Sequence, residues 1–327
     1  MNFRIPEIVD FIRARGAKVV ALQLPEGLKI KGLKLVAEIE EQSNCQCIIL
    51  GDPCYGACDL SKDFHSIADV LVHFAHTPIP SLGKDEDVLF IEAEMDCSVD
   101  ELLPKLLPMA RKHIGLVSTS QHLPLLPKIK EWLESKGVEA HIGQGDRRVS
   151  HAGQILGCNV TSAKSIQHRV DQFLFIGTGG FHALAVALET KKDVLILDPA
   201  LQEIRDVREL KDRVLRQRYA AIALASEAKD FAVIISTKIG QKRKELAFSL
   251  RSLLKSRGKN AVLIAMDNVT PEQLLSFRVD IFVSTACPRI AIDEAARFHR
   301  PIITPLELEI ALGIRSWDDY AFDSISG

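Results

Sequence analysis

Seven cysteines offer the most direct chemistry in this 327-residue sequence. Three of them, Cys58, Cys158 and Cys287, stand beside small residues in short loops that follow apolar runs. Thiolates hold iron or zinc, and small neighbours let the backbone come close to a bulky ligand. The three are far apart in the chain, so a shared metal site requires the fold to bring them together. Spacing alone also allows the simpler reading that each is a buried core residue.

The other four cysteines are weaker candidates. Cys45 and Cys47 flank the start of a predicted strand, where we expect a structural role. Cys97 follows a predicted strand, and Cys54 shares a loop with Cys58. The sequence contains no CxxC pair, which argues against a zinc ribbon or a thioredoxin-like redox site. The Cys54-x-x-x-Cys58 spacing matches the start of a radical S-adenosylmethionine loop, but the third cysteine of that loop is absent.

The elements that must position these loops repeat one layout three times. Each copy begins with an apolar strand, continues with an amphipathic helix and adds three further apolar strands. Continuously apolar strands separated by helices indicate parallel sheets covered on both faces. The predicted strands are 18–24, 47–50, 69–72 and 88–91 in the first copy, 113–119, 138–142, 171–175 and 194–197 in the second, and 231–237, 261–266, 280–283 and 301–304 in the third.

The repetition predicts an α/β protein of three related small domains, each a roughly four-stranded parallel sheet flanked by helices. We place them at residues 1–108, 109–225 and 226–327, so that each carries one of the three candidate cysteines. One large doubly wound sheet is the alternative that periodicity leaves open. Ligands of parallel sheets bind beyond the carboxyl ends of the strands, which is where the candidate loops stand. The repeat is imperfect, because the third cysteine follows a third strand and the first two follow second strands.

Composition narrows the classes of function. The chain is 47% hydrophobic and 26% charged, with a formal net charge of −2, as in ordinary globular proteins. This charge balance argues against direct nucleic-acid binding, which needs a basic excess. We see neither a signal peptide nor the roughly 20 apolar residues of a membrane span, and we expect a cytoplasmic protein. An odd number of cysteines in such a chain favours metal binding, catalysis or burial over disulfides.

Five motifs follow one another along residues 24–293: Leu24-Pro25-Glu26-Gly27-Leu28, Tyr55-Gly56-Ala57-Cys58-Asp59, Gln154-Ile155-Leu156-Gly157-Cys158, Thr237-Lys238-Ile239-Gly240-Gln241, and Ala286-Cys287-Pro288-Arg289-Ile290-Ala291-Ile292-Asp293. In this order they resemble the diphthamide synthase family in its archaeal form. The resemblance implies three related α/β domains around a central [4Fe–4S] cluster, and a homodimer. It makes Cys58, Cys158 and Cys287 the cluster ligands, whereas Cys54 has no counterpart in that ligand set. Three thiolates for four irons leave one iron open to a substrate.

The resemblance also implies the reaction, the first step of diphthamide biosynthesis. A transferase of this family moves the 3-amino-3-carboxypropyl group of S-adenosylmethionine to a histidine of translation elongation factor 2. The reduced cluster starts a non-standard radical mechanism, and methylthioadenosine is released. The electron donor is not identified by the sequence. The bond that breaks depends on which carbon the pocket holds against the open iron.

Loop residues that follow predicted strands are our candidates for binding S-adenosylmethionine. Gln241 and the backbone of Gly240 could hold its polar groups, and Arg289 could bind its carboxylate in a bidentate fork. An ion pair between Arg289 and Asp293, four residues on, is an equally good reading of that arginine. The further candidates lie in the first two domains: Glu26, Gly27, Gly179 and Gly180.

We assign no catalytic acid or base, since the histidine to be modified belongs to the partner. His76 and His182 follow strands and could face the site, although a structural role is the commoner outcome for such residues.

Two other functions remain open at this stage. A protein similar to quinolinate synthase would use the open iron as a Lewis acid and would need no S-adenosylmethionine. A non-catalytic iron–sulfur sensor, or a subunit of a heteromeric synthase, would bind a cluster without cleaving S-adenosylmethionine. If the cysteines are merely buried, the purified protein will be colourless.

Overall fold

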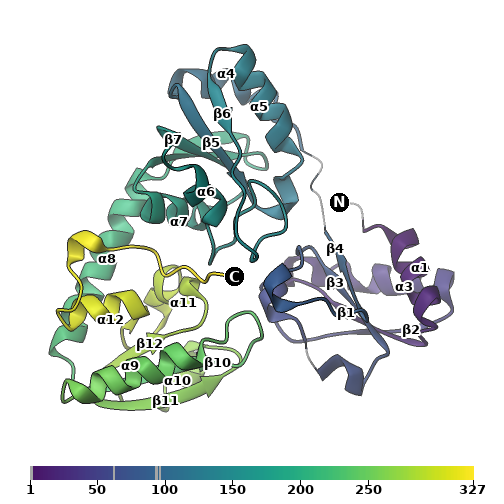
Figure 1. Cartoon of the computed structure of the whole chain (residues 1–327). Helices are drawn as coiled ribbons and strands as arrows, with labels where there is room; N and C mark the ends of the chain where they lie inside the picture. Colours follow the sequence, from purple (N-terminus) through teal and green to yellow (C-terminus); the bar gives the residue numbers. More distant parts are fainter. Residues whose placement is uncertain (1–2, 62, 93–94, 96) are drawn as a thin grey trace.

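A computed structural model describes residues 3–61, 63–92, 95 and 97–327. It contains three separate sheets, which form three lobes at the corners of a triangle (Figure 1). The strand orders are β2-β1-β3-β4, β6-β5-β7-β8-β9 and β11-β10-β12-β13. The predicted fold class is therefore confirmed, and the alternative of one large sheet is wrong. The carboxyl-terminal end of the chain lies at the centre, between the lobes.

The first sheet is wholly parallel and shows how the apolar runs produce two covered faces. Along β1, Val20 and Leu22 are buried with residues of three helices, whereas Ala21 packs on the opposite face with Phe64. The strands are β1 (Val19–Gln23), β2 (Gln46–Ile49), β3 (Val70–Phe74) and β4 (Val88–Ile91). The helical segments are α1 (Ile5–Arg15), α2 (Glu26–Lys29), α3 (Gly32–Ser43), η1 (Ala57–Asp59), η2 (Asp63–Ser66) and η3 (Pro80–Leu82).

The second sheet has a fifth strand that the sequence did not predict. This strand, β9, is antiparallel and lies at the edge. Its sequence, Glu203-Ile204-Arg205-Asp206, is mostly polar and lacks the apolar run that marked the other strands. The strands are β5 (His113–Ser118), β6 (Glu139–His141), β7 (Gln172–Ile176), β8 (Asp193–Asp198) and β9 (Glu203–Asp206). The helical segments are α4 (Leu103–Leu106), η4 (Leu107–Met109), η5 (Ser120–His122), α5 (Leu125–Ser135), α6 (Thr161–Ile166) and α7 (Phe181–Thr190).

The third sheet repeats the parallel pattern of the first. Its strands are β10 (Asp230–Ser236), β11 (Asn260–Met266), β12 (Ile281–Ser284) and β13 (Ile302–Ile303). The helical segments are α9 (Lys244–Ser256), α10 (Pro271–Leu274), α11 (Pro288–Ile292), η6 (Ala295–Arg297), α12 (Pro305–Ala311) and η7 (Trp317–Asp319).

An aspartate before the third strand has the same task in the first and third lobes. Asp69 Oδ2 accepts the backbone N–H groups of Lys18 and Val19, at 2.8 and 2.9 Å. Asp280 Oδ2 accepts the two equivalent N–H groups of Lys229 and Asp230, both at 3.0 Å. These bonds hold the pKa of each carboxyl below its ordinary value. Each aspartate thus aligns the start of its lobe's central strand.

The hydrophobic cores cross the predicted domain boundaries. Val99 and Leu103 precede residue 108 but are buried with side chains of the second sheet. Tyr320 and Phe322, near the end of the chain, also pack in a core cluster of the second lobe. The division at residues 108 and 226 therefore stays a prediction about folding units. In the part of the chain that the structure describes, no helix combines the length and apolarity needed to cross a membrane.

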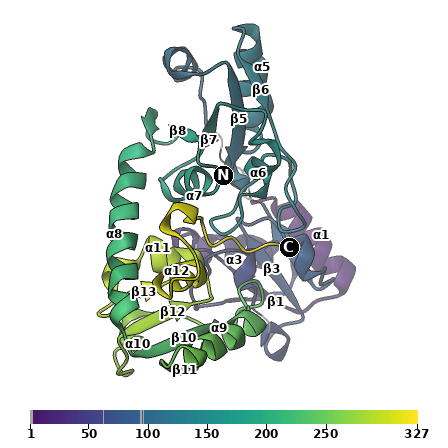
Figure 2. The same ribbon diagram turned by 60° about the vertical axis from the view of Figure 1, so that its left-hand side comes forward.

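The long helix α8 (Arg208–Glu227) connects the second and third lobes (Figure 2). A buried ion pair fixes it to α12: Arg218 donates to Glu307 through Nε at 2.8 Å and through an η nitrogen at 2.6 Å. The same guanidinium donates to the carbonyl of Ile302 at 2.8 Å, and Tyr320 donates its hydroxyl to Glu307 at 3.0 Å. Glu307 also completes a capping box with Thr304 at the start of α12.

We predict that Glu307→Gln destabilises the protein strongly, because it leaves the Arg218 cation buried without a counter-charge. The expected loss is about 3–5 kcal/mol, seen as a lower midpoint of urea unfolding. Glu134→Gln is the control, since Glu134 forms an exposed pair with Lys130 on α5. That change should cost about 0.3–0.5 kcal/mol. Equal effects of the two variants would contradict this account.

Candidate metal centre

The three candidate cysteines line one cavity of about 200 Å³. Cys58 lies in η1 after β2, Cys158 in the loop between β6 and α6, and Cys287 directly before α11. All three loops stand beyond the carboxyl ends of their strands, as the position of ligand sites in parallel sheets predicts. Three lobes therefore bring together three sulfur atoms that are 100 residues or more apart in the chain. Their role as ligands stays a prediction.

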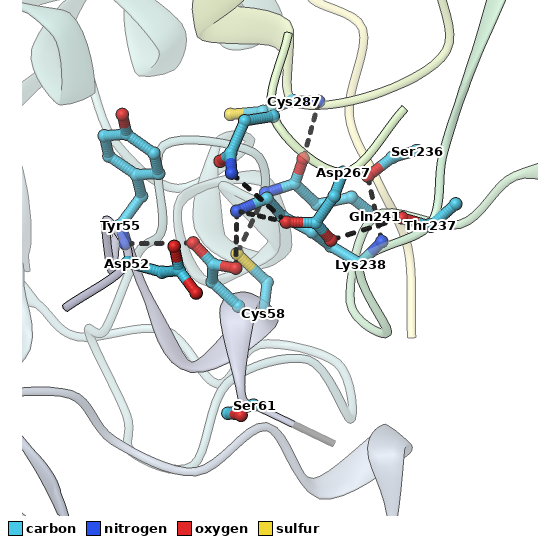
Figure 3. Close-up of polar contacts among 12 residues, drawn as sticks. Asp52, Tyr55, Cys58, Ser61, Ser236, Thr237, Lys238, Gln241, Asp267 and Cys287 are labelled. Carbon is cyan, nitrogen blue, oxygen red and sulfur yellow. Dashed lines mark hydrogen bonds and ion pairs between the residues drawn. The ribbon is translucent and has the colours of Figure 1, made fainter. Parts of the chain in front are cut away.

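The loop after β10 packs directly on the loop that carries Cys58 (Figure 3). Gly240 donates its N–H to the carbonyl of Cys58 at 3.0 Å. A Cβ at Gly240 would lie 2.4 Å from Cys58 Cα, so only glycine fits at this contact. Beside it, the buried Lys238 Nζ lies 2.5 Å from Asp59 Oδ1. Burial raises the pKa of the Asp59 carboxyl, and the ammonium group of Lys238 opposes this shift.

Gln241 connects two of the cysteine loops. Its Nε2 donates to Cys58 Sγ at 3.4 Å, and its Oε1 accepts the backbone N–H of Cys287 at 3.2 Å. The side chain points toward the sulfur atoms in Figure 3 and is only 6% exposed. The sequence indicated Gln241 as a contact of S-adenosylmethionine, a role that stays a prediction. The geometry adds a positioning role that spacing could not reveal.

Sequence reasoning missed Arg148, which is buried beside the third sulfur atom. Its guanidinium donates to Cys158 Sγ at 3.7 Å and also to the carbonyl of Gly240. Gly240 therefore has both its N–H and its carbonyl engaged within the protein. The only sequence signal was a pair of arginines in a polar loop, which is common on surfaces.

The end of the chain closes the site from a further side. Ile325 donates its N–H to the carbonyl of Cys158 at 2.7 Å, and Asn159 Nδ2 donates to the carbonyl of Ile325 at 3.0 Å. Asp323 pairs with Arg243 at 2.6 Å, and Arg243 Nε donates to the carbonyl of Thr285. The last residues thus tie the Cys158 loop to the third lobe.

The electrostatics of the cavity suit a multivalent metal group. Burial raises the pKa of the Cys58 thiol to about 11, with a further contribution from Cys158. Burial, and then the other two cysteines, also raise the pKa of Cys287. Two neighbouring thiols with raised pKa values, those of Cys58 and Cys287, become thiolates together only when a cation compensates their charge. An all-sulfur donor set with N–H donors aimed at two of the sulfur atoms fits an iron–sulfur cluster.

The structure shows one of the two alternatives for Arg289, the ion pair with Asp293, whereas binding of S-adenosylmethionine by this arginine stays a prediction. Its guanidinium binds Asp293 Oδ2 at 2.6 and 3.1 Å, so the ion pair has formed. It also lies 5.1 Å from the centre of the Phe181 ring and lines the cysteine cavity. A second cavity of about 110 Å³ on the side of the third lobe shares Tyr55, Cys58, Cys287 and Arg289 with the first.

The remaining candidates for S-adenosylmethionine lie outside the described residues that line these two cavities. Glu26 and Gly27 begin α2, where Glu26 pairs with Lys29 at 2.6 Å. Gly179 has a φ of 74°, and Gly180 packs so closely that a Cβ would lie 2.6 Å from the side chain of Leu210. The backbone conformation of Gly179 and the close packing of Gly180 give these two glycines a structural reason. A role of Glu26, Gly27, Gly179 and Gly180 in binding S-adenosylmethionine stays a prediction.

Three α/β lobes that each supply one cysteine to a common cavity define a class of protein with a sulfur-lined site between its lobes. Within that class, residues 24–321 match the family described as "Putative diphthamide synthesis protein". The chain therefore belongs to the diphthamide synthesis family. This membership sets aside the quinolinate-synthase-like reading.

Individual relatives agree with the family. The chain is 38% identical to the 2-(3-amino-3-carboxypropyl)histidine synthase of Pyrococcus horikoshii, over 98% of this chain and 93% of the relative. It is 30% identical to subunit 1 of the human synthase, over 100% of this chain and 75% of the relative. Two crystal structures of Dph2 from Pyrococcus horikoshii, one with a 4Fe-4S cluster, are similar with a TM-score of 0.92 and 37% identity, covering 100% of this chain and 95% of theirs.

We predict that Gly240→Ala separates the loop after β10 from the Cys58 loop, because the added methyl group would overlap backbone atoms. Overpacking of this kind costs about 1–3 kcal/mol, and thermal unfolding should shift down by several degrees. Gly51→Ala is a matched control, since a Cβ there would meet nothing within 4 Å. A Gly240→Ala protein as stable as the wild type would show that the close packing is not needed.

Proposed function

We propose that this protein is a transferase that carries out the first step of diphthamide biosynthesis. In this proposal it transfers the 3-amino-3-carboxypropyl group of S-adenosylmethionine to a histidine of translation elongation factor 2. Two lines of support come together: the chain's family, whose members are named for this product, and the three cysteines. The observation that carries the proposal is that Cys58, Cys158 and Cys287, one from each lobe, line a single cavity.

The three cysteines would hold a [4Fe–4S] cluster, with one iron left without a protein thiolate. When bound and reduced, the cluster supplies the electron that breaks the bond between sulfur and the γ-carbon of S-adenosylmethionine. Gln241 and Arg148 would hold Cys58 and Cys158 in place through N–H bonds to their sulfur atoms. Hydrogen bonds of this kind tune the potential of a cluster.

The remaining task of this chain is to orient S-adenosylmethionine so that the γ-carbon, and no other, faces the open iron. Arg289 is the best placed of the predicted contacts, because its guanidinium lines both cavities and suits a carboxylate. Binding would require it to share or release Asp293. Gln241, Gly240, Glu26, Gly27, Gly179 and Gly180 remain the other candidates in this proposal.

The test is an anaerobic assay. The protein is reconstituted with iron and sulfide, reduced with dithionite, which replaces the unidentified electron donor, and given S-adenosylmethionine. We expect methylthioadenosine and a 3-amino-3-carboxypropyl product, both lost in Cys58→Ala, Cys158→Ala and Cys287→Ala. Cys47→Ala is the control, because Cys47 lies at the start of β2 and outside the described lining of the cavity. Deoxyadenosine as the product would contradict the proposed bond cleavage.

A protein that binds a cluster but leaves S-adenosylmethionine intact would instead support the sensor or subunit reading.

The oligomeric state also bears on the subunit reading, because the human relative is named as subunit 1 of its synthase. We propose a homodimer, since all three cysteines are present in this one chain. Light scattering of the purified protein should give twice the 36.2 kDa mass of the chain. With elongation factor 2 added, mass spectrometry should find the transferred group on a histidine of that substrate.

A further inference from the structure

A chain of buried and partly buried hydrogen bonds reaches the cysteine cavity from the first lobe and ends at His76. His73, on β3, is fully buried, and its Nε2 lies 2.9 Å from Nδ1 of His76. The other nitrogen of His73, Nδ1, lies 2.8 Å from Oε1 of Gln23 on β1. His76 lines the cavity together with Cys58 and the other two cysteines. The proposed function gives this chain of contacts no role.

The hydrogen-bond partners fix which ring nitrogen carries each proton. Gln23 Nε2 lies 2.8 Å from the carbonyl of Asp59, and Gln23 Oε1 accepts the N–H of Ser61 at 3.3 Å, so the orientation of this amide is determined. His73 must therefore donate its Nδ1–H to Gln23 Oε1, which leaves a lone pair on its Nε2. That lone pair accepts the Nδ1–H of His76. The Nε2 of His76 is then unprotonated.

The backbone before His76 supports a role beyond packing. Ala75 has a φ of 66°, a left-handed conformation that is uncommon for a residue other than glycine. Its N–H donates to the carbonyl of Ile91 at 2.7 Å, and its carbonyl accepts from Gln121 Nε2 at 3.0 Å. These two bonds hold the turn that places His76 against His73 at the cavity. The fold thus maintains an unfavourable conformation at this point.

The proposed reaction needs a base at such a place. The product named for the relatives carries the new group on carbon 2 of the imidazole. Overall, the C–S bond of the sulfonium breaks with its electron pair going to methylthioadenosine, a C–C bond forms, and the proton on carbon 2 leaves. No net oxidation occurs, because any electron lent at the start is returned. The departing proton is acidic, since its loss restores the aromatic ring, and a weak neutral base can accept it.

We propose that Nε2 of His76 accepts the proton from carbon 2 of the substrate imidazole, and that Gln23 and His73 are positioning residues that keep this nitrogen unprotonated. The inference rests on the proposed function. Burial lowers the pKa of His76 to about 4, which keeps the ring neutral at physiological pH.

A metal site is the alternative use of these histidines, because Cys54 Sγ lies within 4.8 Å of ligand nitrogens of both. A metal held by Cys54 and the two histidines would need the lone pair of His73, but the hydrogen bond between the two rings already uses it. The geometry therefore favours His76 as a proton acceptor over a metal site.

His182 is the rival base and provides the matched comparison. It lines the same cavity, and burial lowers its pKa to about 4 as well. Its ring stacks on Phe175 with centroids 5.7 Å apart, and the guanidinium of Arg289 adds to the lowering of its pKa. Among the described residues, no hydrogen bond fixes its tautomer in the way that His73 fixes that of His76.

The first test compares cleavage with transfer in the reconstituted protein, using S-adenosylmethionine and elongation factor 2. In His76→Gln, methylthioadenosine should still form, but the transferred group per methylthioadenosine should fall by about 10²-fold or more. His182→Gln should keep the wild-type ratio, whatever its rate. Added imidazole should restore transfer in His76→Ala, which it would not do for a purely structural residue. An unchanged ratio in His76→Gln, or the loss appearing in His182→Gln instead, would overturn the proposal.

The second test does not depend on activity or on the cluster. Nitrogen-15 NMR of the metal-free protein should show His76 with its proton on Nδ1 and an unprotonated Nε2 at neutral pH. His73→Leu removes the acceptor, and the fixed tautomer of His76 should be lost. A proton on Nε2 in the wild type would overturn the proposal even if the transferase activity is found. Absence of methylthioadenosine from the wild type, with the expected NMR result, would count against the proposed function and not against the hydrogen-bond chain.

Discussion

Close contact between Gly240 and the backbone of Cys58 is the constraint on which the rest of the site depends. A loop of the third lobe reaches the first lobe only because residue 240 has no side chain there. Once this contact forms, Gln241 is placed between Cys58 and Cys287, and the carbonyl of Gly240 accepts the guanidinium of Arg148 beside Cys158. One backbone contact therefore sets the relative positions of three sulfur-bearing loops. Polar bonds and close packing therefore position these loops relative to one another.

The arrangement of the three lobes meets a second physical requirement, which is rigidity. Three small sheets, each with its own buried faces, must be held rigidly enough to keep a shared cavity in shape. Helix α8 and the buried Arg218–Glu307 pair connect the second and third lobes, and the last residues of the chain cross between them. A buried ion pair contributes little net stability, because desolvation offsets its attraction, but it tolerates few alternative arrangements. Such interactions suit a protein whose site lies between lobes.

The cavity between the lobes is lined by chemically different groups: thiols, an arginine and histidines. Sulfur atoms and their N–H donors lie at the point where the lobes meet, and Arg289 stands where the two cavities adjoin. The histidine chain of the first lobe approaches the cavity from β3. In the function we propose, this arrangement would separate the group that cleaves S-adenosylmethionine from the group that receives the proton.

The sequence by itself determined the repeated α/β layout, because apolar runs and helical spacing are local patterns that each lobe satisfies independently. It also indicated the cysteine loops, and the five motifs pointed to the family. It did not predict β9, whose four residues are mostly polar, or the core contacts of Val99 and Tyr320 across the expected boundaries. Only the tertiary structure decided that Arg148 and Gln241 reach the sulfur atoms and that Gln23, His73 and His76 form one chain of hydrogen bonds. Those contacts join residues from different strands and lobes, and their geometry depends on how the sheets pack, which no local pattern records.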